Sequence, residues 1–121
     1  MKIYGIKNCE TVKKALNALD AKGIKYEFHD YKKQGIEASK IQEWLKKADL
    51  SILVNKKGTT YKKLSDETKN ALENVKTAIP VMMEYTSVIK RPILEYKKNI
   101  IIGFDTDQYD LLSVNFIANA N

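Results

Sequence analysis

The first thirty residues change their hydrophobic period twice, and this pattern restricts the fold more than any other feature of the chain. Residues 2–6 have the character of a short strand, and residues 24–30 alternate apolar and polar side chains with the period of a strand. Between them, apolar residues recur at the spacing of one helix face: Val12, Ala15, Leu16 and Leu19. A strand, a helix and a strand within about 30 residues predict a βαβ unit with parallel strands.

Four residues give this unit its expected details. Asn8 is the expected N-cap of the helix, and Gly23 is its expected C′ residue. Gly5 suits a place where the backbone of the first strand approaches another part of the chain closely. His29 falls among the polar positions of the second strand, so we expect it to face solvent.

The middle of the chain is expected to be mainly helical. One helix should begin at Ser39, where a capping box is possible, or a turn earlier near Glu37. Another should begin near Ser65, and a third should carry Pro80 in its first turn. Residues 55–61 are polar and rich in glycine and threonine, which predicts a loop.

Strand patterns return after Pro92. Residues 93–96 and 100–104 are separated by a hairpin-length turn, and Asp105 is placed to cap a last helix. A parallel βαβ unit, a helical block and an antiparallel ββα unit follow the order of a thioredoxin-like α/β fold. We therefore predict a single domain over residues 1–121, with a mixed four-stranded sheet and a helical insertion at roughly residues 32–88.

Composition excludes several classes of protein. One Cys cannot form an internal disulfide, and one Cys with one His cannot build a structural zinc site, so we expect no metal. The sequence shows no secretion signal and no apolar run near the ~20 residues of a membrane span, which predicts a cytoplasmic protein without a membrane partner. The net charge of +6 comes almost entirely from lysine and is expected to be a solvated surface, so nucleic acid is not a favoured partner.

The single cysteine, Cys9, falls between the first strand and the first helix. Backbone N–H groups at a helix N-terminus lack intrahelical partners, and the helix dipole favours an anion there. A Cys9 thiolate should therefore be stabilised and nucleophilic at neutral pH, and Lys7 would add positive charge. The alternative is a small buried apolar residue, since free cysteines are often buried.

The residues around Cys9 limit its chemistry. The run Cys9-Glu10-Thr11-Val12 has no second cysteine, so a resolving thiol would come from glutathione or a partner protein. The only arginine, Arg91, offers a planar fork for a carboxylate or an oxyanion and stands beside Pro92. Its alternative is an exposed arginine without a function.

Segments 4–15, 55–64, 89–94 and 102–105 together resemble the arsenate-reductase-like family, and most closely its Spx/YffB-type branch. The resemblance implies a thioredoxin-like fold with a helical insertion. It also implies that Cys9 is the family cysteine, and that Arg91 and Pro92 are the family Arg-Pro pair, with a cis proline facing the cysteine loop.

The branches of that family differ in their site residues. Its arsenate reductases attack arsenate with the cysteine, pass the oxidised product to glutathione and glutaredoxin, and hold the oxyanion with three arginines. Only Arg91 matches these arginines, and Asn55 stands at the first of the other positions, beside Lys56. Spx regulators bind RNA polymerase and usually carry a second cysteine where this chain has Val12. The remaining branch is thought to contain glutathione-dependent thiol reductases.

We therefore expect a single-cysteine thiol oxidoreductase that forms a mixed disulfide at Cys9, with glutathione as co-substrate and no bound cofactor. Two alternatives stay open: an arsenate reductase coupled to glutathione and glutaredoxin, and a non-enzymatic regulator that binds RNA polymerase. The residues expected to bind glutathione or a substrate anion are Lys7, Asn8, Lys56, Thr60, Arg91 and Pro92.

Overall fold

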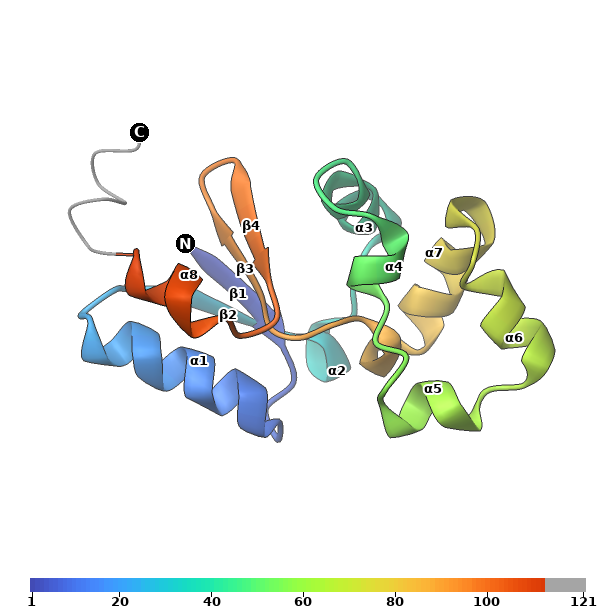
Figure 1. Cartoon of the computed structure of the whole chain (residues 1–121), viewed down its shortest axis with the longest axis horizontal. Helices are drawn as coiled ribbons and strands as arrows, with labels where there is room; N and C mark the ends of the chain where they lie inside the picture. The colour runs from blue at the N-terminus through green and yellow to red at the C-terminus, as the bar shows by residue number, and fades with distance from the viewer. Residues whose placement is uncertain (113–121) are drawn as a thin grey trace. The chain divides into compact units, whose positions relative to one another are not determined.

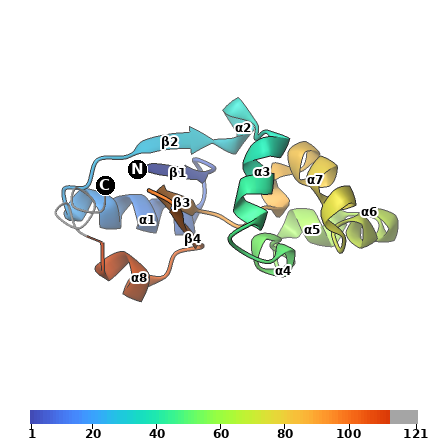
Figure 2. The same cartoon turned by 90° about the horizontal axis from the view of Figure 1, so that it is seen from above.

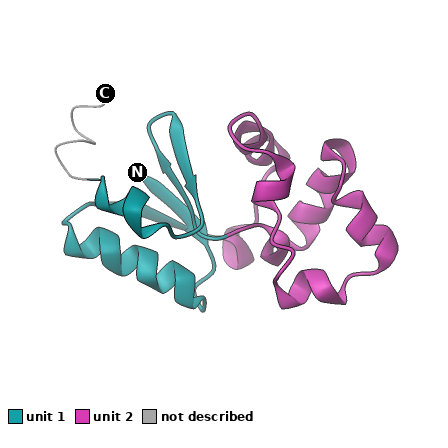
Figure 3. Cartoon of the chain, viewed as in Figure 1, with its two compact units in different colours: residues 1–30, 91–121 teal, residues 31–90 magenta. Residues whose placement is uncertain are grey.

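A computed structural model describes residues 1–112, and these fall into two compact units (Figures 1 and 3). The first unit contains Met1–Asp30 and the chain from Arg91 onward, and the second contains Tyr31–Lys90. The helical insertion expected at roughly residues 32–88 corresponds to the second unit. That the whole chain acts as a single domain stays a prediction.

The first unit is built on a four-stranded mixed sheet with strand order β2-β1-β3-β4. β1 (Lys2–Gly5) pairs with β2 (Glu27–Asp30) in parallel. β3 (Ile93–Tyr96) lies on the side of β1 away from β2 and pairs with β1 antiparallel. β3 also pairs antiparallel with β4 (Asn99–Ile102). The predicted parallel βαβ unit and antiparallel hairpin are therefore both confirmed.

Two helices cover one face of this sheet (Figures 1 and 2). α1 (Glu10–Ala21) connects β1 to β2, and α8 (Thr106–Asp110) follows β4. Their apolar sides meet the inward residues of the strands in one core, where burial of apolar surface stabilises the unit. The buried core residues are Ile3, Ala15, Leu19, Ile24, Leu94, Ile101, Tyr109 and Leu112.

The cap residues predicted for the two ends of α1 differ in outcome. Gly23 has a φ of 70°, so the predicted C′ glycine is confirmed. The predicted N-cap was wrong: Cys9, not Asn8, is the N-cap, with extended backbone and a carbonyl that accepts the Lys13 N–H at 2.9 Å. Asn8 has a better capping side chain than Cys9, but the path of the chain after β1 makes the helix begin one residue later than Asn8 would favour.

The second strand is shorter than predicted and carries a residue in an unexpected environment. β2 begins at Glu27 rather than at residue 24, because β1 begins at Lys2, which is the register partner of Glu27. His29 is half-buried rather than solvent-facing, since the same register places it beside Tyr4. The two rings are in contact at a tilt of 39°, with their centroids 4.9 Å apart. On its other side, Tyr4 donates a hydrogen bond to Glu95 at 2.9 Å.

The hairpin and the last helix agree closely with expectation. The turn between β3 and β4 is one residue shorter than predicted, and Lys97 takes a positive φ of 57° there. Asp105 caps α8 as predicted, accepting hydrogen bonds from the N–H groups of Asp107 and Gln108 at 3.0 and 3.2 Å.

The second unit is helical. Its segments pack around fully buried apolar side chains that include Ile41, Trp44 and Met82. An isolated bridge pairs Val54, in the middle of the unit, with Ile89 near its end. Its helices are α2 (Tyr31–Gln34), α3 (Ala38–Leu45), α4 (Leu50–Leu53), α5 (Thr59–Lys63), α6 (Asp66–Ala71), α7 (Val75–Glu84) and the 3₁₀ helix η1 (Thr86–Val88).

Sequence signals located these helices unevenly. α3 begins after Glu37, the earlier of the two predicted starts. α6 begins at Asp66, next to the start expected near Ser65, and the Ser65 side chain caps it. The loop predicted for residues 55–61 ends at Gly58, the N-cap of α5, so the prediction was wrong for residues 59–61, which are helical. α7 starts at Val75, so the prediction that Pro80 lies in its first turn was wrong. Capping by Asn74 and burial of Ala78 and Met82 set that helix in place despite its internal proline.

Among residues 1–112, no helix combines the length and the apolar character needed to cross a membrane.

Candidate active site around Cys9

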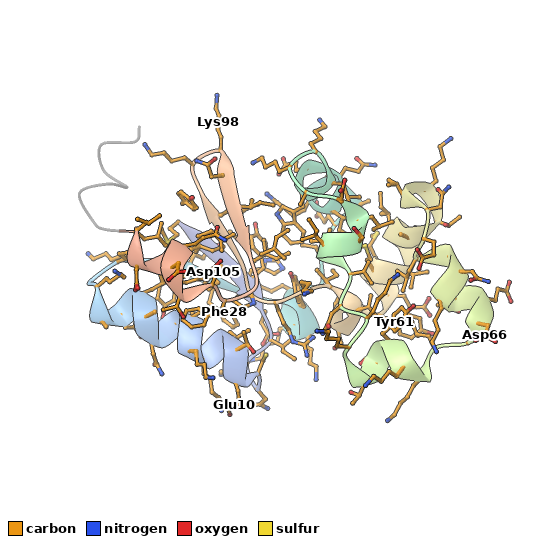
Figure 4. All side chains as sticks on the ribbon, in the orientation of Figure 1. Glu10, Phe28, Tyr61, Asp66, Lys98 and Asp105 are labelled. Atoms are coloured by element: carbon orange, nitrogen blue, oxygen red, sulfur yellow. The ribbon has the colours of Figure 1, made fainter. Side chains whose placement is uncertain are left out.

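Cys9 lies where the chain leaves the carboxyl end of β1 and enters α1, as the sequence predicted. Figure 4 labels the next residue, Glu10, at this end of the helix. The thiol is half-buried, so it is accessible to a reagent and is not part of the core. The alternative of a buried apolar cysteine is therefore wrong.

Arg91 and Pro92 reach the same place from the adjacent strand. They immediately precede β3, whose Ile93 is the register partner of Tyr4 in β1. The peptide bond between them is cis, as the family resemblance implied, and the buried Pro92 carbonyl accepts the Gly103 N–H at 2.8 Å. The Arg91 guanidinium donates a hydrogen bond to the Cys9 sulfur. Of the predicted site residues, the structure thus brings Arg91 into direct contact with Cys9.

The surroundings of Cys9 change its acidity. Burial raises the pKa of the Cys9 thiol, but this effect is outweighed by the backbone N–H of Val12, the hydrogen bond and charge of Arg91, and the backbone N–H of Thr11. The net result is that the pKa of Cys9 lies below its ordinary value. Although the thiol forms no strict capping hydrogen bond, these donors approach it closely enough to favour the thiolate.

Lys7 and Asn8 lie on the segment between β1 and α1, directly before Cys9, and both are exposed. Their position beside the thiol in the chain is compatible with contact to a bound anion. Their role as ligands stays a prediction.

Lys56 and Thr60 belong to the second unit. The Lys56 ammonium forms an ion pair with Glu73 at 2.7 Å, so an anionic ligand would have to compete with that carboxylate. Thr60 is half-buried in the first turn of α5. The participation of both residues in the Cys9 site stays a prediction.

The helix N–H groups that were expected to favour the Cys9 thiolate are those of Thr11 and Val12. The sequence did not say which residues would supply them, because backbone groups carry no residue-specific signal. The close approach predicted at Gly5 is found, and the approaching group is the side chain of Val12. Within residues 1–112 there is no group of three or more His, Cys, Asp or Glu residues able to hold a metal ion.

The sheet order, the cysteine at the N-terminus of the first helix and the cis proline before β3 define a thioredoxin-like fold with a single-cysteine site. The model of the ArsC family matches residues 4–112. The chain belongs to the ArsC family, and it is an arsenate-reductase-like protein with one cysteine.

Similar proteins cover almost the whole chain. An uncharacterized protein of Haemophilus influenzae is 38% identical over 107 residues, which is 88% of this chain and 93% of that protein. A solved structure described as YFFB has 38% identity and a TM-score of 0.85, covering 90% of this chain and 95% of the other. A solution structure of an arsenate reductase (ArsC) related protein from Brucella melitensis has 40% identity and a TM-score of 0.71, covering 90% of each chain.

Proposed function

We propose that this chain is a glutathione-dependent thiol oxidoreductase in which the Cys9 thiolate is the nucleophile. The observation that carries the proposal is the convergence of two helix N–H groups and the Arg91 guanidinium on one sulfur, which lowers the pKa of Cys9. A thiolate is the reactive form of cysteine in disulfide exchange, so this arrangement raises the fraction of reactive sulfur at neutral pH.

The reaction needs one protein thiol and one external thiol. The Cys9 thiolate attacks a sulfur of the substrate disulfide, forming a mixed disulfide and releasing the other half as a thiolate that takes a proton from solvent. A glutathione thiolate then attacks the mixed disulfide. If the bound half is glutathione, this second step releases glutathione disulfide and regenerates the Cys9 thiolate. In that case one glutathione thiol is oxidised for each mixed disulfide of glutathione that is reduced. A bound half other than glutathione needs a second glutathione thiol, so that two are oxidised for each substrate disulfide.

Glutathione fits the charges and the thiol count of the site. Cys9 is the only cysteine of the chain, so the resolving thiol must come from another molecule. Glutathione supplies that thiol together with two carboxylates, for which Arg91 provides a planar donor. Lys7 and Asn8 flank Cys9 in the first unit, and Lys56 and Thr60 of the second unit are proposed as additional ligands.

Intact mass spectrometry after incubation with oxidised glutathione tests the proposal directly. We expect one glutathione adduct on the wild-type protein, none on Cys9→Ser, and full reversal by reduced glutathione. A panel of disulfides adds a test of charge: oxidised glutathione should react faster than cationic cystamine, and the difference should shrink in salt. Failure to form the adduct at any concentration up to millimolar would contradict the proposed function.

Arsenate reduction is a second candidate, because relatives of this chain are described as arsenate reductase related. The Cys9 thiolate is a suitable nucleophile for arsenate, and Arg91 can hold an oxyanion. A coupled assay with arsenate, glutathione and glutaredoxin decides the point. Turnover above that of Cys9→Ser would support it, and turnover equal to that control would remove it.

A further inference from the structure

Gly5 lies in β1 close to both segments that form the Cys9 site, the start of α1 and the Arg91-Pro92 pair before β3. It is the buried last residue of β1, and the chain runs from it through Cys9 into α1. The antiparallel register that pairs Tyr4 with Ile93, continued by one residue, sets Gly5 beside Pro92. The size of the side chain at residue 5 therefore affects the position of α1, whose N-cap is Cys9. It does so next to the segment that contains Arg91.

The first turns of α1 pack on the backbone of Gly5 with no room for a side chain. A Cβ atom at residue 5 would lie 2.7 Å from Cγ2 of Val12 and 3.5 Å from its Cγ1. Carbon atoms in favourable contact are about 3.5–4.0 Å apart, so such an atom would force α1 and β1 apart. Val12 is fully buried and has a stiff β-branched side chain, which limits how far it can turn aside.

The same residue that packs on Gly5 also supplies a donor to the thiol. Of the single interactions that lower the pKa of Cys9, the hydrogen bond from the backbone N–H of Val12 has the largest effect, ahead of either the hydrogen bond or the charge of Arg91 taken alone. Because its side chain is held against β1, the position of this N–H relative to the sulfur depends on the packing at Gly5. Displacement of the helix would also change the distance between Cys9 and Arg91, which is attached to the sheet.

We propose that Gly5 is a positioning residue for Cys9: its missing side chain lets Val12 pack directly on β1, which aims the Val12 N–H at the sulfur. Gly5 itself touches no substrate and acts only through Val12. The inference rests on the proposed function, in which Cys9 reacts as a thiolate.

The test is the pH dependence of Cys9 alkylation in Gly5→Ala. The rate with iodoacetamide is followed by intact mass from acid to alkaline pH, and thermal unfolding is measured in parallel. We expect alkylation near neutral pH to slow by about fivefold, the effect of weakening one hydrogen bond to a charged group. At alkaline pH, where the thiol is ionised in both proteins, the rates should converge.

A second substitution should reverse the effect of Gly5→Ala. Val12→Ala removes Cγ1 and Cγ2, the two atoms nearest to the new methyl group, while its Cβ lies 3.7 Å away, an ordinary contact distance. The double variant Gly5→Ala/Val12→Ala should therefore recover most of the wild-type pH profile. The control is a substitution of Ile101, a buried core residue of the edge strand β4. Of Ile101→Val and Ile101→Ala, the variant that lowers Tm by about as much as Gly5→Ala is used. This control should leave the pH profile of Cys9 alkylation unchanged.

The outcomes separate this inference from the proposed function. If Gly5→Ala lowers Tm but keeps the wild-type alkylation profile, Gly5 is merely a packing residue. If the double variant recovers Tm but not the profile, Gly5 does not act through the Val12 side chain, and the proposal is wrong. Alkylation requires no disulfide substrate, so a wild-type protein that forms no glutathione adduct would contradict the proposed function, while a shifted profile in Gly5→Ala would still support the positioning role.

Discussion

The Arg91 guanidinium donates a hydrogen bond to the Cys9 sulfur, although the two residues belong to separate segments of the first unit, with the whole second unit between them in the sequence. Pairing of β1 with β3 makes this contact possible, because Cys9 follows one strand and Arg91 precedes the other. The only arginine and the only cysteine of the chain therefore form a single site.

The first prediction concerns the pH dependence of Cys9 itself. Because the pKa of Cys9 is below its ordinary value in the folded protein, alkylation should reach half its maximal rate at a lower pH than for a cysteine in an unfolded peptide. Iodoacetamide kinetics on the native protein, and on the same protein in denaturant, measure both values. Equal midpoints in the two states would show that the fold does not activate the thiol.

The lowered pKa also predicts a change of stability with pH. The unfolded thiol binds its proton more tightly, so the Cys9 thiolate stabilises the fold fully above the unfolded pKa. This contribution is lost as the pH falls through the folded pKa. Denaturant unfolding of wild type and Cys9→Ser at several pH values should show the difference between them growing from neutral to alkaline pH. A difference independent of pH would contradict this linkage.

Arg91 is predicted to act on Cys9 through both its charge and its shape. Arg91→Lys keeps the charge but loses the planar fork, and Arg91→Ala loses both. We expect alkylation at neutral pH to slow slightly in the first variant and by about tenfold in the second, the effect of a lost charge-assisted hydrogen bond. The rate with oxidised glutathione should fall further than the alkylation rate in both, since Arg91 is also proposed to bind the carboxylate. Parallel losses in the two assays would limit Arg91 to activation of the thiol.

Much of the first unit was predictable because its information is local. The period of residues 2–30 specified the βαβ unit, and the polar side chain of Asp105 specified the cap of α8. The position of Cys9 at a strand–helix junction followed from the same pattern, without knowledge of the rest of the molecule.

The parts that escaped prediction depend on contacts between distant residues or on the backbone. Lys56 precedes α5 and pairs with Glu73, which follows α6, and no local pattern encodes this contact. Helix N–H donors were expected at Cys9, but the sequence could not tell that Thr11 and Val12 supply them, since every residue but proline carries such a group. Pro80 was expected to start a helix, but burial of Ala78 and Met82 on either side extends α7 through it. Tertiary packing prevailed over local preference there.

Asp105 offers a prediction for the end of the first unit. Hydrogen bonds from Gln108 and from the Asp107 N–H hold the pKa of Asp105 below its ordinary value. The ionised cap should therefore stabilise the fold above the unfolded carboxyl pKa and lose this effect as the pH falls through the folded pKa. Asp105→Ala should lower Tm at neutral pH and less in acid. Asp105→Asn, which caps without ionising, should lower Tm less than Ala and remove the pH dependence. A Tm difference that persists unchanged in acid would contradict the role of the charge.

The ion pair in the second unit allows the proposed role of Lys56 to be tested. The hydrogen bond and charge of Glu73 raise the pKa of Lys56, and both side chains are largely solvent-exposed, so the pair itself should add little stability. If Lys56 assists binding of glutathione carboxylates, Glu73→Gln should release its ammonium and speed adduct formation with oxidised glutathione, about twofold to threefold for a surface charge. Lys56→Met should slow the same reaction. Neither variant should alter the reaction with neutral 2-hydroxyethyl disulfide, and Lys76→Met serves as a control for loss of one exposed lysine from the same unit. Equal effects of Lys56→Met and Lys76→Met would reduce Lys56 to part of the general positive surface.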